Sequence, residues 1–372
     1  MIKKENVLDS ANRRKAQGLE QLLAMRQRVE QADALPEQSV EPTHLSIVHI
    51  APDPFQPRRA MPDVLRARWC AGEDLRAILA EWERVAQALL NERGYDTRWG
   101  EWIEPDLNAE LLPDLSTAHP HLRMWNDLLR LAGSIFRDGL AVPISVYQDG
   151  SAYRLLMGER RLLAFCLLTW MGYDGFQHIP ALVAPRYDPV QQAVENGARK
   201  DLNAIGVARQ LAVLLMSFNG IQVEGSTQPA QGWYAQAYDL RVPRGYADAL
   251  ATVLGLSHTR QISQYRDLLT LPKPVWNWAD EFSWPEGKLR ALRQKATSDE
   301  QLIQLAQAEV ALALGSAKRA APTVAQRVSK AAGSAEKALE RVITLDDKAL
   351  RAMGESQRRH LRELAQALLK RL

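Results

Sequence analysis

The sequence predicts an α+β fold, in which a small mixed domain precedes an all-helical region. Between 126 and 183, segments with helical and strand-like spacing alternate, and one strand meets a helix at a glycine. From 187 onward, apolar residues recur only at helical spacing. With 372 residues, the chain is long enough for two or three domains.

The composition excludes several classes of protein. The 47 Lys and Arg residues against 44 Asp and Glu give a net charge of +3, with 24% charged and 46% hydrophobic residues. Such a chain is neither wholly disordered nor a polybasic protein that binds nucleic acid by bulk charge. Cys70 and Cys166 lie far apart, so neither a disulfide framework nor a structural zinc site is expected.

No segment indicates a membrane. The longest apolar run, at about 162–173, is too short to span a bilayer. The start of the chain, Met1–Glu5, lacks the apolar stretch of a signal peptide. We therefore expect a soluble, cytoplasmic protein without a membrane partner.

The chain opens with a basic helical arm at 1–40. Its basic cluster at 13–15 is explained more simply by a solvated helix than by a DNA contact. The mixed domain is expected at 41–188, beginning with a short strand at 44–50. Three prolines in 51–59 forbid a helix or a central strand, so this segment is expected to be an extended loop that ends in two arginines.

Tryptophans are concentrated at 61–125, where a helix is expected at 74–92. They are Trp69, Trp82, Trp99, Trp102 and Trp125. Because buried tryptophans usually fill a core, a small core is predicted here rather than a ligand cage.

The most regular part of the chain follows. We expect a helix at 126–138, strands at 142–147 and 152–157, a helix at 159–170 and a strand at 179–183. Gly139 ends the first helix, and Asp149-Gly150 predicts a tight turn between the first two strands.

The helical region is expected at 189–314. It comprises a helix at 189–200, a helix capped by Asn203, a loop at 219–243, a helix pair at 246–271 and helices over 286–314. A flexible linker at 315–335 leads to a short basic helical tail at 336–372. The leucines of this tail give it an apolar face for dimerisation.

The run Met157–Arg161 has features of an anion site. A helix N-terminus presents backbone N–H groups and positive dipole to a ligand, and Gly158 lets an anion come close. Two arginines in the first turn suit phosphate oxygens. A solvated Glu-Arg cluster explains the same residues equally well on this motif alone.

The run Glu195–Leu202 offers a second set of candidate site residues, which could bind a metal ion. Glu195 and Asn196 carry the hard oxygen atoms that Mg²⁺ takes beside phosphates. An ion pair between Glu195 and Arg199, one helical turn apart, is the simpler explanation of the run by itself. The pair His119 and His121 has no matching ligand set in sequence and is expected to lie in a loop.

Taken in order, these segments resemble the N-terminal domain of the ParB family. The family pattern N-P-x-Q-P-R, then G-E-R-R, then E-N-x-x-R-x-D-L is represented here by Asp53–Arg58, Gly158–Arg161 and Glu195–Leu202. The resemblance covers about 44–60 and 126–218. Because Arg59 and Gly158 lie further apart than in the family, 61–125 is interpreted as an insertion.

The resemblance implies a fold shared with sulfiredoxin and a site for CTP and Mg²⁺. The nucleotide-binding residues that it implies are Gln56, Arg58, Gly158, Glu159, Arg160, Arg161 and Arg199. Glu195 and Asn196 would hold the metal. Ala198 replaces the family's usual glutamine and Leu163 its usual basic residue. Sulfiredoxin chemistry is rejected, because Glu159 stands where that reaction needs a cysteine.

The helix pair at 246–271 is a candidate DNA-reading element. Ala251, Gly255 and Ile262 are the small, glycine and apolar positions of a helix-turn-helix corner, although an ordinary helical hairpin shows them too. The segment at 262–272 resembles the second such helix of the ParB and KorB-like family. The residues expected to face DNA are His258, Thr259, Arg260, Gln261, Ser263, Gln264 and Arg266.

The resemblance as a whole implies a CTP-dependent DNA clamp in plasmid or chromosome partitioning. Its partners would be a specific double-stranded DNA site, a second copy of the chain and a ParA-type ATPase, and its only reaction slow CTP hydrolysis used as a switch. One alternative is a KorB-like transcriptional repressor without clamp activity. Another is a nucleotide-hydrolysing or nuclease member of the same fold. No catalytic residue is assigned.

Overall fold

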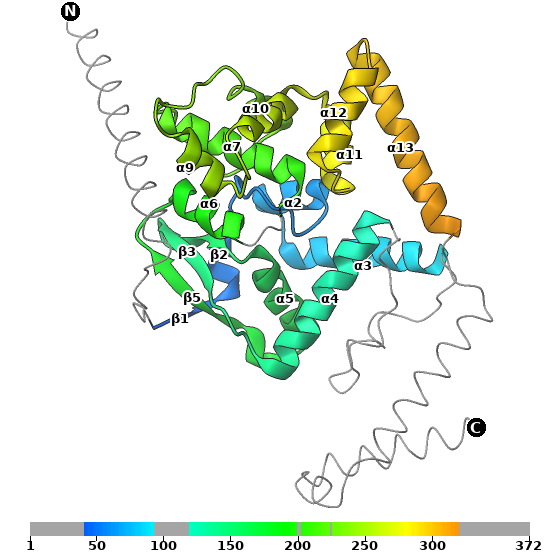
Figure 1. Ribbon diagram of the computed structural model, residues 1–372. Coiled ribbons are helices and arrows are strands. Elements are labelled where there is room, and N and C mark those ends of the chain that lie inside the picture. The colour runs from blue at the N-terminus through cyan, green and yellow to red at the C-terminus, as the bar shows by residue number, and fades with distance from the viewer. Residues whose placement is uncertain (1–40, 93–118, 199–201, 224, 320–372) are drawn as a thin grey trace, which may run out of the picture. The chain divides into compact units, whose positions relative to one another are not determined.

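The computed structural model describes residues 41–92, 119–198, 202–223 and 225–319. By residue contacts the chain divides into Met1–Arg319 and Ala320–Leu372, and every described residue belongs to the first unit. This unit has the predicted α+β fold, with one five-stranded mixed sheet and two hydrophobic cores (Figure 1). The predicted arm, most of the predicted linker and the predicted tail lie outside the described residues.

The sheet has the strand order β1-β5-β3-β4-β2. Its strands are β1 (Thr43–Ser46), β2 (Ile50–Ala51), β3 (Ile144–Asp149), β4 (Ala152–Met157) and β5 (His178–Ala184). β1 runs antiparallel to β5 and β3 antiparallel to β4, whereas β2 is parallel to β4 and β3 is parallel to β5. β3 and β4 form the predicted hairpin, in which Gly150 has the positive φ of a tight turn, 64°.

One short segment supplies both edges of the sheet. The single strand predicted at 44–50 is wrong, because a 3₁₀ turn, η1 (Ile47–His49), separates β1 from β2. Four spacings of about 4.8 Å would put the edges of a flat sheet roughly 19 Å apart. The four steps from Ser46 to Ile50 span about 14 Å at most. The sheet must therefore curl, which lets β2 join the edge opposite β1.

The tryptophan-rich segment forms helices that share a core with the sheet. They are α2 (Asp63–Cys70), α3 (Leu75–Glu92) and the first turns of α4 (Pro120–Asp138). Trp82 and Trp125 meet edge-on, with ring centroids 5.2 Å apart, and Trp69 is buried as well. These three fill a core, as predicted, whereas Trp99 and Trp102 lie outside the described residues.

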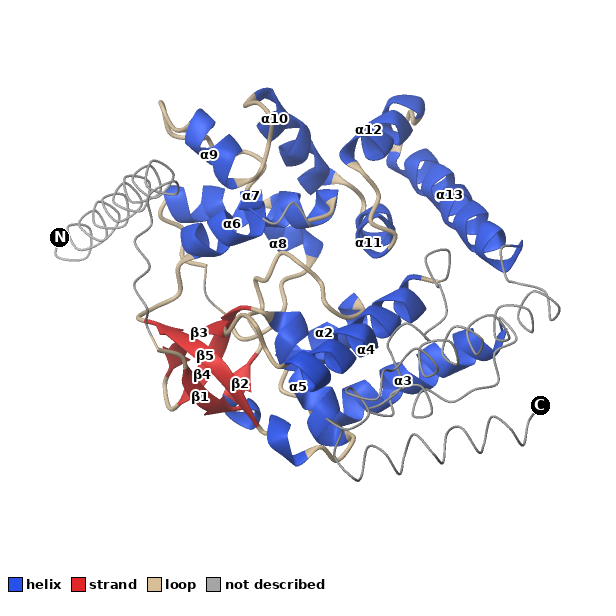
Figure 2. Ribbon diagram, turned by 60° about the horizontal axis from the view of Figure 1, so that its bottom comes forward, coloured by secondary structure: helices blue, strands red, loops and turns tan. Residues whose placement is uncertain are grey.

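The start of α4 lies further upstream than the predicted residue 126. His119 occupies the N-cap and Pro120 the first helical position, where its fixed φ and missing N–H are tolerated. After the hairpin, β4 leads through Gly158 into α5 (Glu159–Trp170). Helices α2 to α5 gather on one side of the sheet (Figure 2).

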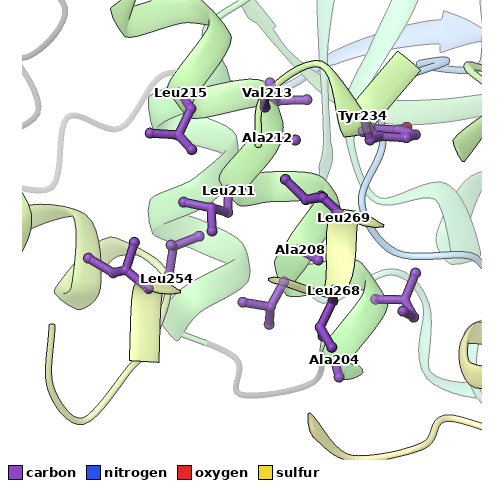
Figure 3. Close-up of a cluster of buried hydrophobic side chains, with 14 of the residues drawn as sticks. Ala204, Ala208, Leu211, Ala212, Val213, Leu215, Tyr234, Leu254, Leu268 and Leu269 are labelled. Atoms are coloured by element: carbon purple, nitrogen blue, oxygen red, sulfur yellow. The ribbon is translucent and has the colours of Figure 1, made fainter. Parts of the chain in front are cut away.

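The remaining helices enclose the second core around α7. They are α6 (Pro189–Ala198), α7 (Ala204–Phe218), α8 (Gln231–Ala235), α9 (Ala247–Val253), α10 (Arg260–Asp267), α11 (Lys273–Glu281), α12 (Glu286–Lys295) and α13 (Asp299–Arg319). Leu211 of α7 lies in one apolar cluster with Leu254 and Leu269 (Figure 3). The predicted cap of α7 is present, since Asn203 Oδ1 accepts a hydrogen bond from the N–H of Gly206 at 2.7 Å.

Three helices differ from the predictions: two were not predicted and one extends further than predicted. α8 lies inside the loop predicted at 219–243, and a helix this short shows no periodicity. α11, directly after Pro272, was not predicted. α13 continues past 315, the predicted start of the linker, because one glycine inside a helix costs only about 1 kcal/mol. Across the described ranges, no helix is both long and apolar enough to cross a membrane.

Candidate functional site

The loop between β2 and α2 is buried, and arginines satisfy its carbonyl groups. Prolines in the loop cannot donate hydrogen bonds, but every buried carbonyl oxygen still needs a donor. Arg154, Arg66, Arg59 and Arg209 donate to the carbonyl oxygens of Pro52, Asp53, Gln56 and Pro57, respectively. These bonds fix a loop that contains two predicted site residues, Gln56 and Arg58.

Asp53 ties the same loop to β4 and α6. Its Oδ1 accepts the N–H of Phe55 at 2.9 Å, and its Oδ2 accepts Nε2 of Gln192 at 2.7 Å. Gln192 Nε2 also reaches the carbonyl oxygen of Leu156 at 2.9 Å. Burial raises the pKa of Asp53, although the bonds from Gln192 and Phe55 oppose this shift.

Gly158 makes the junction between β4 and α5 possible. Its φ is 99°, a conformation that residues with a Cβ adopt only with strain. A Cβ on Gly158 would also lie 2.7 Å from Cγ2 of Ile144. This junction therefore favours glycine, and Gly158, as the N-cap of α5, has no side chain to cap the positive end of the helix dipole.

The two arginines in the first turn of α5 make different contacts. Arg161 Nη1 donates to the carbonyl oxygens of Val142, at 2.6 Å, and Pro143, which holds the guanidinium over Gly158. Arg160 is half-buried and reaches the carbonyl oxygen of Asp127 at 3.4 Å. The Arg161 guanidinium is thus bound to two backbone carbonyl groups beside Gly158, whereas that of Arg160 extends toward α4.

Glu159 is buried in an ion pair with Arg66 of α2. The Arg66 Nη2 to Glu159 Oε2 distance is 2.7 Å, and Nε contacts both carboxylate oxygens at 2.9 and 3.0 Å. Arg66 Nη1 reaches Oε1 of Gln228 at 2.7 Å. The sequence analysis did not identify Arg66 as a site residue. The one indication in the sequence was an arginine among apolar residues of a short helical segment.

A cavity of about 460 Å³ lies where the three sequence motifs meet. Its lining includes six of the predicted nucleotide-binding residues, Gln56, Arg58, Gly158, Glu159, Arg160 and Arg161, together with Asn196. Two buried atoms, Gln56 Oε1 and Asn196 Nδ2, have no hydrogen-bond partner among the described residues. Unpaired buried polar atoms are costly, and a bound ligand can satisfy them.

A second cavity, of about 800 Å³, adjoins the first. The two share Arg58, Ala60, Arg160 and Leu202 in their linings. Arg59 and Asp63 also line the larger one, joined by an ion pair of 2.7 Å. Burial acts to raise the pKa of Asp63, but the charges of Arg59 and Arg209 outweigh it and hold the pKa below its usual value.

The predicted metal ligands are only partly described. Asn196 lines the smaller cavity, where its side chain offers an amide oxygen to a hard cation such as Mg²⁺. The side chain of Glu195 and the whole of Arg199 lie outside what the structure describes. Among the described residues, Asn196 thus fits a Mg²⁺ ligand, and the start of α5 fits an anion-binding site.

The candidate DNA-reading pair consists of α9 and α10. Gly255, at φ 67°, ends α9 in a Schellman motif, with Leu256 N–H bonded to the carbonyl oxygen of Ala251 at 2.8 Å. Thr259 is the N-cap of α10, but its side chain forms no cap hydrogen bond. Gln261 caps the turn instead, accepting the N–H of Ser257 at 2.8 Å.

The seven predicted DNA-facing residues differ in exposure. Exposed residues are His258, Arg260 and Ser263, while Thr259, Gln261, Gln264 and Arg266 are partly buried. Arg266 Nη1 donates to the carbonyl oxygen of Leu240 at 3.3 Å. Ile262 is buried, as the predicted inner face of this helix requires.

Both cysteine thiols have a raised pKa. Burial raises the pKa of Cys166 to about 12 and also raises that of Cys70. A thiol with a raised pKa is a poor nucleophile near neutral pH.

The comparison with curated proteins finds a similarity over part of the chain. A probable chromosome-partitioning protein ParB from Coxiella burnetii (strain RSA 493 / Nine Mile phase I) is 36% identical over 103 residues, 27% of this chain and 33% of that protein. Over these 103 residues the chain is similar to ParB. It spans about a third of the length of this curated relative.

No family model matches the chain. A crystal structure of C-terminally truncated ParB from Caulobacter crescentus, complexed with CTP-gamma-S, aligns with 17% identity over 72% of this chain and 98% of that chain. The TM-score of that alignment is 0.21.

Proposed function

We propose that this ParB-like chain binds CTP with Mg²⁺ in the smaller cavity and DNA through α10, as a nucleotide-dependent DNA clamp in plasmid or chromosome partitioning. The observation that carries the proposal is that three motifs far apart in sequence line one cavity of about 460 Å³. This volume is within the range of small-molecule sites.

The triphosphate is proposed to lie at the start of α5. There the helix dipole, the side-chain-free Gly158 and the guanidinium of Arg160 favour an anion. Arg58 adds a second guanidinium from the buried loop. Arg161, bonded to carbonyl groups, is proposed to shape the site and to support Gly158.

The unpaired atoms of the cavity specify what a ligand must provide. Gln56 Oε1 needs a donor and Asn196 Nδ2 needs an acceptor. The amino group of cytosine supplies the donor, which uracil lacks at that position, and a phosphate oxygen supplies the acceptor. Glu195 and Asn196 are proposed to hold Mg²⁺, which neutralises phosphate charge and assists a slow hydrolysis that serves as a switch.

DNA binding is proposed for the outer face of α10. His258, Arg260 and Ser263 are exposed there and suit base edges or phosphates. A second copy of the chain, bound through the tail at 336–372, and a ParA-type ATPase complete the proposed assembly. In this role the protein would act on the nucleoid or a plasmid in the cytoplasm.

Calorimetric titration tests the nucleotide site. CTP, UTP, ATP and GTP are each titrated with Mg²⁺ into the wild type, into Arg160→Ala and into the control Arg76→Ala, which removes an exposed arginine of α3. We expect binding selective for CTP, lost in Arg160→Ala and kept in Arg76→Ala. Absence of binding by any nucleotide, with and without DNA, contradicts the proposal.

The alternative functions give different results. A repressor without clamp activity binds its DNA site with the same affinity whether or not CTP is present. A nuclease cleaves DNA in a metal-dependent reaction that Glu195→Ala abolishes. The proposed clamp differs from both. CTP changes how long it stays bound to covalently closed circular DNA, and the DNA is not cleaved.

A further inference from the structure

A cluster of two histidines and a glutamate lies outside the proposed nucleotide site. His119 is the N-cap of α4, His121 is in its first turn and Glu281 is the last residue of α11. One ligand atom from each lies within 4.8 Å of the other two. Among the described residues, no other group of three His, Cys, Asp or Glu side chains meets so closely.

The backbone holds these three side chains in place. Trp82 Nε1 donates to the carbonyl oxygen of His121 at 3.2 Å, which anchors the first turn of α4 to the core. On the other side, the neighbour of Glu281, Asp280, accepts from Arg209 at 2.5 Å and from Asn203 at 2.9 Å. The cluster therefore needs little ordering before it binds a ligand.

An ion pair explains only part of this arrangement. His121 Nε2 lies 3.0 Å from Glu281 Oε1, as in an ordinary histidine–carboxylate pair. That pair does not account for His119, whose ring centroid lies 4.9 Å from that of His121. Two imidazoles beside one carboxylate form a set that a divalent metal ion would join.

We propose that His119, His121 and Glu281 bind one Zn²⁺ ion, with the fourth coordination position open to the larger cavity. Two nitrogens and one carboxylate oxygen match the three-ligand zinc sites of proteins. Zinc bonds of about 2.0–2.1 Å place tetrahedral ligand atoms about 3.3 Å apart. The distances in the cluster, 3.0 Å for one pair and up to 4.8 Å for the set, bracket this value.

Binding requires one small rearrangement. His119 Nδ1 accepts the N–H of His121 at 3.2 Å, a long bond. Coordination through Nε2 of His119 puts a proton on Nδ1 and so replaces this bond. His121 and Glu281 both line the larger cavity, so water or another small ligand can complete the coordination.

Such an ion would join the α4 and α11 segments across two separate cores. Sequence spacing gave no indication of it, because the third ligand comes from a helix more than 150 residues away. The site is distinct from the proposed Mg²⁺ site, which uses hard oxygen ligands at the end of α6.

Metal titration of the full chain, without a histidine tag and after treatment with chelator, tests the site. Zn²⁺ is followed by calorimetry and Co²⁺ by visible absorption. Three conservative variants each remove one ligand: His119→Asn keeps a helix cap, His121→Gln keeps a donor to the carboxylate, and Glu281→Gln keeps the side-chain shape. Exposed His49→Ala and His178→Ala are the controls.

We expect one Zn²⁺ per chain, a tetrahedral Co²⁺ spectrum, and a loss of affinity in each ligand variant beyond the 10–100-fold that outer-shell substitutions cost. The controls should bind as the wild type does. Wild-type binding that survives all three ligand substitutions, or falls only in the controls, overturns the proposal. So does the absence of binding by the wild type, which would leave a plain ion pair. A circular-dichroism melt without metal identifies any variant that fails to fold, and the remaining variants then decide.

Discussion

Arg66 of helix α2 and Glu159 at the start of α5 form a buried, bidentate ion pair. Their side chains are 0% and 4% exposed, and the closest distance is 2.7 Å. The first turn of α5, at the proposed phosphate site, is therefore fixed by a residue of α2. This relationship gives the tryptophan-rich segment a structural role at the site, in addition to its part in the core.

Arg66→Met should cost about 3–5 kcal/mol of unfolding free energy, because it leaves the Glu159 carboxylate buried without a partner. The double variant Arg66→Met with Glu159→Leu should recover most of that loss. Arg68→Met on the same helix is the control, since its ion pair with Glu73 is far more exposed and solvent screens it, so its loss should change the unfolding free energy little. Urea unfolding measures all three, and equal losses for Arg66→Met and Arg68→Met would contradict the account.

Asp53→Asn should make the protein less sensitive to pH. Burial raises the folded-state pKa of Asp53 above its usual 3.8, so the folded state holds its proton more tightly than the unfolded state. Stability from this group is present below pH 3.8 and falls as pH rises through the folded-state pKa. The difference in unfolding free energy, variant minus wild type, should grow with pH over this window and then level off. A difference independent of pH, or the same trend in exposed Asp174→Asn, argues against it.

Gly158→Ala should lower stability by about 2–4 kcal/mol and abolish CTP binding. Positive φ costs an alanine about 1–2 kcal/mol, and its Cβ would meet Ile144 Cγ2 at 2.7 Å. Gly172→Ala separates the two effects, because Gly172 has φ 92° but open space around its Cβ position. Thermal unfolding and CTP titration of both variants provide the comparison. A Gly158→Ala protein as stable as Gly172→Ala would exclude the steric clash.

Arg260→Ala should weaken DNA binding and reduce its salt dependence. An exposed arginine that contacts a phosphate releases about one counterion, so its loss lowers the slope of log affinity against log salt by about 1. Binding to a panel of DNA fragments at several salt concentrations measures the slope, with Arg76→Ala on α3 as the control. An unchanged slope removes α10 from the proposed DNA interface.

The sequence predicted the fold where local signals and tertiary structure agree. The hairpin turn at Gly150, the cap at Asn203 and the start of α5 each follow from residues with a specific backbone role. The single strand predicted at 44–50 failed because curling of the sheet depends on partners more than 90 residues away.

The candidate site was also predictable only where its residues carry a local signal. Its motifs could be recognised one by one, but that Gln56, Gly158 and Asn196 line one cavity is a property of the folded chain. The buried partners Arg66 and Arg209 carry no local signal, because an arginine on a helix is usually exposed. The ligand set of His119, His121 and Glu281 is likewise visible only in three dimensions.

Hydrogen–deuterium exchange with and without CTP and Mg²⁺ tests the central claim, that three distant segments form one nucleotide site. The account predicts slower exchange, on nucleotide addition, in peptides that contain 55–60, 157–163 and 192–198 together, with α3 and α12 unchanged. Protection confined to other segments, or no protection at saturating CTP, would contradict it.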